Sequence, residues 1–301
     1  MKRVALFGSK GQLGVELRSE FTARGYEVAC FDRSLVDITD AAAVERTIAS
    51  VDPALVVNAA AYNQVDLAET EPLTAFQVNA LAVRNLAVAC RNSDAQLVHF
   101  STDYVFDGQA GRAYREEDPT RPIGAYAVSK LAGELYARAY LDTPLIIRTS
   151  GVYGPGGMDT ARGNFVELML RLAAKNDPIR VVEDHVASPT YAPALAARTV
   201  DLVELGTHGA NGPGGIFHIG GGTPISWFQW ARKIFEAAAL NPPLKATNER
   251  EFRTPARRPK YSALSNAKME ALGIAPMPSL DDAIRDYMAA RASRLTAMNA
   301  S

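Results

Sequence analysis

A short apolar run at residues 3–7 is followed at once by glycines at positions 8, 11 and 14, and an apolar pattern typical of a helix continues behind them. Glycines at this spacing permit a tight turn, a close approach of the backbone to a pyrophosphate, and close packing of the helix on the strand. The N-terminus of such a helix faces the phosphates. Between a first strand and a first helix, the spacing favours a dinucleotide-binding turn over a plain glycine turn.

Further apolar runs alternate with helical patterns through the first half of the chain. We expect strands at 27–31, 55–58, 96–100 and 145–149, with helices at 41–50, 72–90 and 125–140 between them. This alternation predicts an α/β fold with a doubly wound parallel Rossmann sheet, in which ligands bind outside the carboxyl ends of the strands. The residues expected at those ends are Gly8, Asp32, Ala59 and Ser101.

The second half is less regular and is expected to form a smaller, loop-rich substrate lobe. Helical patterns occupy 164–174, 191–205 and 224–239, short strands are expected at 179–182 and 216–219, and prolines interrupt the rest. We predict an NAD(P)-binding domain from 1–150 plus roughly 186–220. The nucleotide-sugar-binding lobe would comprise roughly 151–185 and 221–290, and 291–301 would form a tail.

Tyr126 and Lys130 lie four residues apart in the helix expected at 125–140, so they share one face. A free phenol has a pKa of about 10, and a cation about 4 Å away favours the phenolate by at most about 4 kcal/mol at a dielectric near 20. We therefore expect Lys130 to lower the pKa of Tyr126 toward the range of general acid catalysis. The hydroxyl of Ser101 or Thr102 would hold the carbonyl that receives the proton.

Asp32 ends the second expected strand, where an acidic residue can bind the adenosine ribose. Arg33 beside it could instead accept a 2′-phosphate, so the sequence permits NADH or NADPH. Asp37 would continue along the adenine site or cap the next helix, and Asp40 is the better candidate for the cap.

Composition excludes several classes of protein. The net charge of −1 and the 22% charged residues give no basic tail for nucleic acid and no membrane-surface patch. The N-terminal apolar run is too short for a secretory signal, and we expect no apolar run long enough to span a bilayer. Cys30 and Cys90 indicate reduced thiols in a cytoplasmic protein. The histidines, at 99, 185, 208 and 218, show no metal-ligand spacing, so no metal is expected.

Residues 253–259 place three arginines on a loop stiffened by two prolines. Arginine forks suit phosphate oxygens. A solvated basic loop explains the same residues equally well, and the sequence alone leaves both interpretations open.

Several stretches together resemble the extended short-chain dehydrogenase/reductases, and within them the dTDP-4-dehydrorhamnose reductases. They cover nearly the whole chain, and the combination of Ser-Thr-Asp-Tyr-Val-Phe with the late Pro-Ala-Arg-Arg-Pro is the most specific part. The resemblance implies hydride transfer from NAD(P)H to C4 of dTDP-4-dehydro-β-L-rhamnose, giving dTDP-β-L-rhamnose. The matching stretches are 7–14, 58–61, 65–66 with Glu69, 78–80, 101–106, 126–130, 163–165 and 254–259.

The resemblance also implies a role for each matching residue. Tyr126 would donate the proton, Lys130 would hold the nicotinamide ribose, and Thr102 would bind the 4-keto oxygen. The implied cofactor-binding residues are Gly8, Gly11, Gln12, Leu13, Gly14, Asp32, Arg33, Asp37, Ile38, Ala59, Ala60, Ala61, Ser101, Tyr126 and Lys130. The implied substrate-binding residues are Thr102, Asp103, Tyr104, Tyr126, Asn164, Arg257 and Arg258.

Two segments depart from the family pattern. Gly151 stands where the family usually carries a tryptophan that lines the sugar site, and 184–190 alters the segment Asp-Gln-x-Gly-x-Pro-Thr. The first change leaves the exact sugar open. Some members use Mg²⁺ at a homodimer contact built from acidic residues, to which Glu16 would contribute.

Two alternative functions remain open. The first is a reductase or epimerase of another nucleotide-sugar; a dehydratase is disfavoured because Tyr104, not an acid, follows Thr102-Asp103. The second is a non-catalytic NADP-binding regulatory homologue. The presence of Tyr126, Lys130 and Thr102 together argues against it, because a binding module needs no complete triad.

Overall fold

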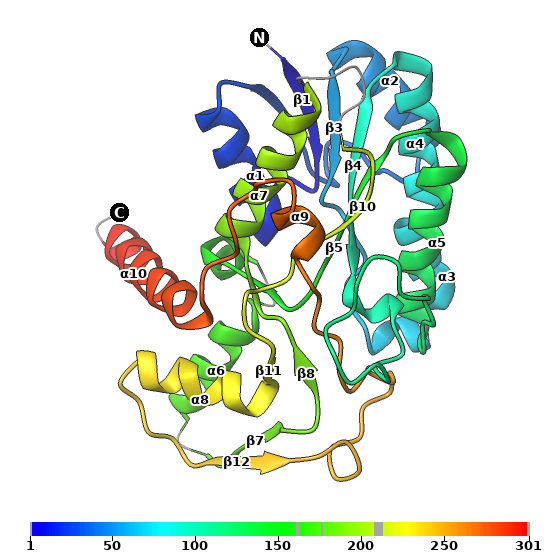
Figure 1. Cartoon of the computed structure of the whole chain (residues 1–301). Helices are drawn as coiled ribbons and strands as arrows, with labels where there is room; N and C mark the ends of the chain where they lie inside the picture. Colours follow the sequence, from blue (N-terminus) through cyan, green and yellow to red (C-terminus); the bar gives the residue numbers. More distant parts are fainter. Residues whose placement is uncertain (1, 161–162, 176, 208–212, 300–301) are drawn as a thin grey trace.

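A computed structural model of the chain describes residues 2–160, 163–175, 177–207 and 213–299, and its centre is a six-stranded parallel sheet (Figure 1). The strand order is β10-β5-β4-β3-β1-β2, so the direction of winding reverses between β1 and β3. In such sheets ligands bind at this switch point, outside the carboxyl ends of the strands. The predicted doubly wound fold is therefore confirmed. The strands are β1 (Arg3–Phe7), β2 (Glu27–Phe31), β3 (Leu55–Asn58), β4 (Gln96–Thr102), β5 (Leu145–Thr149) and β10 (Gly215–His218).

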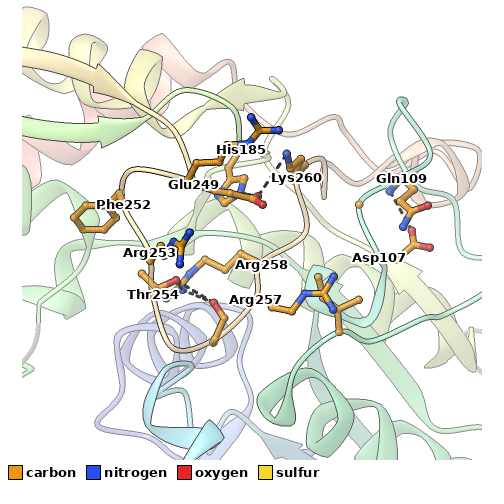
Figure 2. A pocket seen from close by; sticks show the side chains of 14 residues that line it. Asp107, Gln109, His185, Glu249, Phe252, Arg253, Thr254, Arg257, Arg258 and Lys260 are labelled. Atoms are coloured by element: carbon orange, nitrogen blue, oxygen red, sulfur yellow. Dashed lines mark hydrogen bonds and ion pairs between the residues drawn. The ribbon is translucent and has the colours of Figure 1, made fainter.

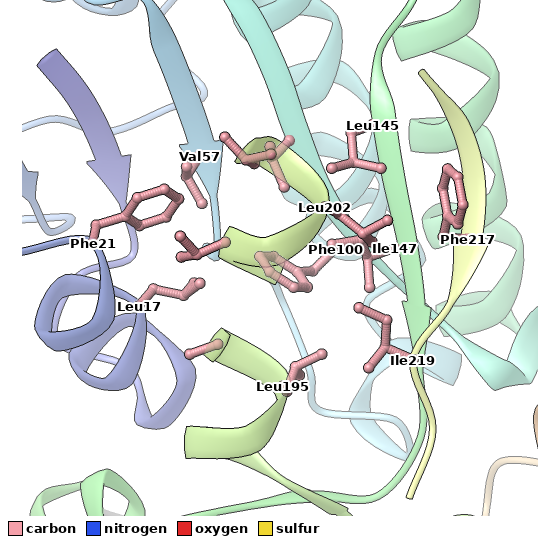
Figure 3. Packing of buried hydrophobic residues seen from close by; sticks show 14 of the residues in the cluster. Leu17, Phe21, Val57, Phe100, Leu145, Ile147, Leu195, Leu202, Phe217 and Ile219 are labelled. Atoms are coloured by element: carbon pink, nitrogen blue, oxygen red, sulfur yellow. The ribbon is translucent and has the colours of Figure 1, made fainter. Parts of the chain in front are cut away.

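Helices cover both faces of the sheet (Figure 1). On one face α1 packs against α7, and Leu17, Phe21 and Leu195 fill the space against Val57 and Ile147 (Figure 3). On the other face α2, α4 and α5 lie side by side over a second apolar cluster. The helices are α1 (Gln12–Ala23), α2 (Ala41–Val51), α4 (Ala82–Ser93), α5 (Ala125–Tyr140) and α7 (Ala192–Thr207).

The long helix expected at 72–90 is interrupted. It consists of α3 (Pro72–Phe76), a π-helical turn η2 (Gln77–Leu81) and α4. Turns of this kind are rare in proteins, and those that occur are often found at functional sites. Together Pro72–Ser93 is long and apolar enough to cross a membrane, which corrects the expectation that no run has this length; half of the span is buried inside the protein, as in a core helix.

A third apolar cluster fills the lobe formed by the second half of the chain, which lies below the sheet in Figure 1. Trp230 of α8 packs against Tyr153 and Phe165, and Tyr287 of α10 closes the cluster. The helices of this lobe are α6 (Phe165–Ala173), α8 (Trp227–Ala237) and α10 (Leu280–Asn299), while α9 (Ala267–Glu270) packs against β10 of the sheet. Its strands are β6 (Val152–Tyr153), β7 (Ile179–Val182), β8 (Val186–Ala187), β9 (Thr190–Tyr191), β11 (Ile225–Ser226) and β12 (Leu244–Thr247). Short helical turns are η1 (Leu67–Glu69), η3 (Asp103–Val105) and η4 (Pro155–Asp159).

Two predictions for the second half were wrong. The helix expected at 224–239 begins at Trp227, after β11, because Ser226 forms a capping box with Gln229. The proline-rich region contains β12, which pairs with β7. Helix α10 runs on to Asn299, through most of the region predicted as a tail, and acidic residues in its first turn favour its start; the tail itself stays a prediction. The proposed division into two domains remains a prediction.

Candidate active site

A cavity of about 400 Å³ lies at the switch point, between the ends of β1, β2 and β3. The backbone is tightly packed here, since a Cβ at Gly8 would lie 2.5 Å from the Ala60 nitrogen, and Gly8 has a φ of +81° that favours glycine. Nine of the predicted cofactor residues line this cavity: Gly8, Gly11, Asp32, Arg33, Asp37, Ile38, Ala59, Ala60 and Ala61.

The glycine turn leads directly into α1. Gly11 is the N-cap of this helix and supplies no side-chain hydrogen bond, so the first N–H groups of α1 have no side-chain cap. A Cβ at Gly14 would lie 2.1 Å from the Gly8 carbonyl oxygen, so this glycine allows the helix to pack on the turn. An uncapped helix N-terminus beside a cavity of this size fits the pyrophosphate of a dinucleotide.

Asp32 follows β2 at the edge of this cavity. Its carboxylate pairs with Lys10, and its Oδ1 also accepts from the Ser34 backbone nitrogen at 2.7 Å. These partners, Lys10 first, lower the pKa of Asp32 well below its usual value. Two cations, Lys10 and Arg33, therefore flank the acid that was predicted to bind ribose.

Thr102 and Tyr126 meet between the end of β4 and the first turn of α5, where the Thr102 side chain acts on the Tyr126 hydroxyl and favours a lower pKa. The Thr102 oxygen also accepts from the Tyr104 backbone nitrogen at 3.2 Å. The Tyr104 ring stands edge-on to the Tyr126 ring, with 6.1 Å between centroids. The structure thus places Thr102 and Tyr104 against the phenol of Tyr126, and all three are predicted site residues.

Lys130 lies one helical turn after Tyr126 and is 2% exposed. Its ammonium donates to the Phe100 carbonyl at 2.6 Å, and burial lowers its pKa to about 8. The predicted effect on the phenol has the opposite direction: burial raises the pKa of Tyr126 to about 12, and the hydrogen bond from Thr102 only partly offsets this. The expectation that Lys130 lowers this pKa is therefore wrong for the chain as described.

A buried ion pair lies beneath this site. Glu134 and Arg148, 1% and 2% exposed, form two hydrogen bonds of 3.0 and 2.7 Å. Ser101 donates to Glu134 at 2.5 Å, so its hydroxyl faces this pair and not the cavity. Ser101 thus acts as a support of β4 and α5, while its role toward a cofactor stays a prediction.

Two further side chains that the sequence interpretation missed hold α5 in place. Glu69 accepts from the Ala125 nitrogen at 2.8 Å, which satisfies a backbone group at the start of the helix that carries Tyr126. Asn79, inside the π-helical turn, donates to the Ser129 hydroxyl at 3.0 Å and hydrogen-bonds both backbone groups of Tyr62. Glu69 and Asn79 both belong to stretches that resemble the family, which was the available signal.

A second cavity, of about 420 Å³, is bounded by the arginine loop and by residues 107–109 (Figure 2). We call its basic side the cationic wall; its members are Arg250, Arg253, Arg257, Arg258 and Lys260. Within the described ranges, Arg250, Arg253 and Arg257 form no ion pair and are exposed. Their guanidinium groups are available to phosphate oxygens.

Arg258 differs from its neighbour Arg257. It binds Asp66 through two bonds of 3.0 and 2.8 Å, donates to Thr254 at 2.5 Å, and hydrogen-bonds the Tyr104 hydroxyl. Asp66 also accepts from the Ala256 nitrogen at 3.1 Å. Arg258 therefore fastens the arginine loop to the segment after β3 and places it against Tyr104.

The remaining predicted residues serve packing. Asn164 is the N-cap of α6, accepting from the Glu167 nitrogen at 3.1 Å, and donates to the Gly154 carbonyl. Gln12 donates to the Val152 carbonyl at 2.9 Å, and Leu13 packs against the core. For these three residues the predicted contacts with ligands remain predictions.

The glycine at position 151, where the family usually carries a tryptophan, has a physical explanation. Gly151 has a φ of +53°, a conformation that strains residues with a bulky side chain. A Cβ there would approach Pro189 at 3.4 Å and the Trp230 ring at 3.8 Å. The backbone of this chain therefore favours glycine at 151.

Two groups of side chains could be considered for a metal ion. Glu16 accepts from the Gly156 nitrogen at 3.3 Å and faces Arg294, a cation that disfavours a metal ion there, so its surroundings do not fit Mg²⁺. Within the described ranges, one group of three side chains, Asp184, His185 and Glu249, brings its ligand atoms within 4.8 Å of one another. The Lys260 Nζ lies 3.6 Å from the Glu249 Oε2, and the spacing of the histidines in the sequence does not indicate this group. His208 lies outside the described residues.

A dinucleotide cavity at the switch point and a tyrosine–threonine pair beside it define the class: a dinucleotide-dependent oxidoreductase of the short-chain dehydrogenase/reductase type. The chain belongs to the family described as RmlD substrate binding domain, whose model matches residues 1–293. The family resemblance drawn from the sequence is thereby confirmed.

Individual relatives are similar to this chain along nearly its whole length. The chain is 37% identical to the spore coat polysaccharide biosynthesis protein SpsK of Bacillus subtilis, over 97% of this chain and 99% of the relative. It is 40% identical to a dTDP-4-dehydrorhamnose reductase of Streptomyces griseus, over 90% and 88%. A Bacillus anthracis dTDP-4-dehydrorhamnose reductase, solved in complex with NADP, superposes with a TM-score of 0.88 at 35% identity, over 96% and 99%.

Proposed function

We propose that this chain reduces the 4-keto group of dTDP-4-dehydro-β-L-rhamnose to dTDP-β-L-rhamnose, a step of dTDP-rhamnose biosynthesis that supplies cell-surface polysaccharide. The observation that carries the proposal is the pairing of Tyr126, in the first turn of α5, with Thr102 at the end of β4, where Thr102 acts directly on the Tyr126 phenol. The reductases of Streptomyces griseus and Bacillus anthracis support the choice of substrate.

The reaction adds a hydride to C4 and a proton to the keto oxygen. A bound NADPH or NADH would supply the hydride from the cavity at the switch point. Tyr126 gives its phenolic proton to the oxygen, and Thr102 holds that oxygen in place. Because burial raises the pKa of Tyr126 to about 12, the phenol is protonated at neutral pH, which is the form that the reduction needs.

The cationic wall would bind the diphosphate of the nucleotide-sugar. Arg257 and Arg253 are exposed on the loop in Figure 2 and can turn toward phosphate oxygens. Arg258 is held by Asp66 and sits against Tyr104, so it would keep this loop beside the reacting centre.

Both reduced cofactors are proposed to bind. Asp32 offers a carboxylate to a ribose hydroxyl, as NADH requires, while Lys10 and Arg33 offer charge to the 2′-phosphate of NADPH. We place the reaction in the cytoplasm, which the free thiols Cys30 and Cys90 support. A homodimer remains a prediction that light scattering tests.

The test mixes the purified protein with NADPH and enzymatically prepared dTDP-4-dehydro-6-deoxyglucose, with and without the 3,5-epimerase, and follows the absorbance of the reduced nicotinamide. We expect oxidation only when the epimerase is present. Oxidation of the cofactor without the epimerase would show that the enzyme reduces the unepimerised sugar. This is the alternative substrate that Gly151 leaves open. No oxidation with either cofactor, despite measurable cofactor binding, would contradict the proposed reaction.

A further inference from the structure

The segment 249–260, which contains the arginine loop, has both of its ends at one short stretch of the chain, residues 184–186. At the far end of the segment, the Val186 nitrogen donates to the Lys260 carbonyl at 2.7 Å. At its start, the Glu249 nitrogen donates to the Asp184 carboxylate at 3.3 Å. Loops whose ends lie this close together are frequently functional. We call the place where the two ends meet the neck of the loop.

Three side chains that can ligate a metal ion lie at this neck. The ligand atoms of Asp184, His185 and Glu249 all lie within 4.8 Å of one another. Asp184 and His185 connect β7 to β8, and Glu249 follows β12, which pairs with β7. The pairing of these two strands therefore brings together side chains from distant parts of the chain, since His185 and Glu249 are 64 positions apart.

Two of the three ligand atoms already have the separation that a tetrahedral metal site needs. His185 Nε2 lies 3.2 Å from Glu249 Oε2. Zinc binds histidine nitrogen and carboxylate oxygen at about 2.0–2.2 Å, so two ligand atoms of its tetrahedron lie about 3.4 Å apart. The Asp184 carboxylate has to come at most about 1.5 Å closer, which a rotation of its side chain supplies.

The burial of Asp184 is an observation independent of this spacing. Its Oδ2 accepts from the Glu249 nitrogen, whereas its Oδ1 is buried and has no hydrogen-bond partner among the residues that the structure describes. A buried carboxylate oxygen without a partner is costly, and a bound ion is one way to satisfy it. His185 is 7% exposed, so the group reaches into the protein and differs from an acidic patch on an open surface.

The charges at the neck also differ from those at Glu16. Two carboxylates lie at the neck, and the Lys260 ammonium is 3.6 Å from Glu249 Oε2. The Lys260 side chain is 59% exposed, so it can turn into solvent at little cost when a metal ion binds. Arg294, which faces Glu16, is instead held in place by two hydrogen bonds.

The identity of residue 185 favours a transition metal. His185 takes the place of the glutamine in the segment Asp-Gln-x-Gly-x-Pro-Thr that the family usually carries. Imidazole suits Zn²⁺, Cu²⁺, Fe²⁺ and Ni²⁺, whereas sites made of carboxylate, carbonyl and water suit Mg²⁺ and Ca²⁺. The departure from the family pattern therefore adds the ligand that selects a transition metal, and glutamine is the natural replacement with which to test it.

We propose that Asp184, His185 and Glu249 bind one divalent transition-metal ion, represented by Zn²⁺, at the neck of the loop. Three protein ligands leave a fourth position for water. The ion takes the place of Lys260 as the partner of Glu249, satisfies the buried oxygen of Asp184 and closes the loop that carries the cationic wall. This inference does not depend on the proposed reductase reaction.

The test titrates ZnCl₂ into the full-length, tag-free protein after treatment with a chelator, by calorimetry and without cofactor or substrate. We expect one ion to bind per chain, and MgCl₂ to bind far more weakly. His185→Gln and Glu249→Gln should each weaken Zn²⁺ binding at least about 100-fold, because losing a ligand costs more than the roughly 10- to 100-fold typical of a group that only supports a ligand. Glu251→Gln is the matched control, since Glu251 lies in the same turn but pairs with Arg180, and it should bind Zn²⁺ like the wild type.

Lys260→Gln should change the affinity in the opposite direction. It removes the cation that competes for Glu249, so Zn²⁺ should bind about two- to fivefold more tightly than to the wild type. Weaker binding of Zn²⁺ to Lys260→Gln would contradict the assignment of Glu249 as a ligand.

An NMR measurement locates the ion. The chain has four histidines, and the imidazole signals of His185 are assigned by their loss in His185→Gln. We expect Zn²⁺ to shift these signals in the wild type. Unshifted His185 signals, undiminished binding in both glutamine variants, or no binding of Zn²⁺ to the wild type would each overturn the proposal.

Two features keep this test decisive. The Glu249 side chain is 46% exposed, so Glu249→Gln provides the comparison if His185→Gln does not fold. If the wild type never oxidises NADPH, the proposed function fails, while the titration with Zn²⁺ still decides whether the neck of the loop binds a metal ion.

Discussion

The catalytic edge of the sheet and the cationic wall hold their charges in opposite ways. At the edge, Lys130, Glu134 and Asp103 are at most 3% exposed, and each has partners inside the protein. On the wall, Arg253 and Arg257 are exposed and form no ion pair in the described ranges. Groups that take part in the reaction must be held in position before the ligand arrives. Groups that attract a diphosphate can act while they are exposed to solvent.

Two ion pairs show what this difference means for stability. Glu134–Arg148 is buried, and an uncompensated charge left there would be costly. Asp66–Arg258 is partly exposed, so water screens part of any loss. Variants at the edge should therefore affect turnover or folding, and variants on the wall should affect affinity.

The largest effect is expected from Tyr126→Phe. Removing the hydroxyl removes the proton donor, and general acid catalysis contributes about 10²- to 10⁴-fold, so kcat should fall by about 10³-fold or more. The affinity for NADPH, measured by fluorescence titration, should stay within about twofold of the wild type, because the cavity at the switch point is untouched. Substantial turnover in this variant would remove Tyr126 from the mechanism and end the contrast between the two regions.

The next effect concerns folding. Glu134→Ala leaves Arg148 buried and without its carboxylate, which should lower the free energy of unfolding by about 3–5 kcal/mol in urea denaturation. The matched control is Asp118→Ala, which removes the partner of the exposed Arg112 in a surface loop and should cost about 1 kcal/mol. Equal losses of unfolding free energy in the two variants would show that burial does not distinguish the two ion pairs.

This buried pair also marks how far the sequence could be interpreted. Periodicity located β1, β2, β3, β5 and α5, because an alternation of short apolar runs and helices is a local signal. Glu134 carries no such signal, since its partners Ser101 and Arg148 are distant in the chain. Asp66 and Glu69 were noted only as part of a family pattern, and their contacts with Arg258 and α5 emerge from tertiary structure.

Two errors have a different origin. The region expected to be rich in loops contains the helix α10. The sequence did not predict it, because prolines precede residue 280 and the amphipathic pattern of this helix is weak. The expected effect of Lys130 on Tyr126 assumed that the nearest cation decides the pKa. In the folded chain burial outweighs it, and the direction of a shift depends on solvent exposure that periodicity does not give.

A smaller effect is expected on the wall. Arg257→Ala removes one charged contact to a phosphate and should raise the KM for the nucleotide-sugar about tenfold with kcat nearly unchanged. Higher salt should reduce the difference between variant and wild type, because the side chain is exposed. Arg258→Ala is the informative comparison, since it also releases Asp66 and Tyr104 and should lower kcat as well as raise KM. An unchanged KM in Arg257→Ala would favour the solvated basic loop.

The smallest effect is expected at the cofactor cavity, where Lys10 and Arg33 are exposed like the arginines of the wall. Asp32→Ala removes a carboxylate that can bind a ribose hydroxyl, and it frees Lys10 for a 2′-phosphate. NADH should therefore bind about three- to fivefold more weakly, while NADPH should bind as well as before or better. Lys10→Ala should show the reverse preference, with the larger loss for NADPH. Isothermal titration with both cofactors measures all four values. Equal losses of NADH and NADPH in Asp32→Ala would contradict the ribose assignment and leave Asp32 as the partner that keeps Lys10 in place.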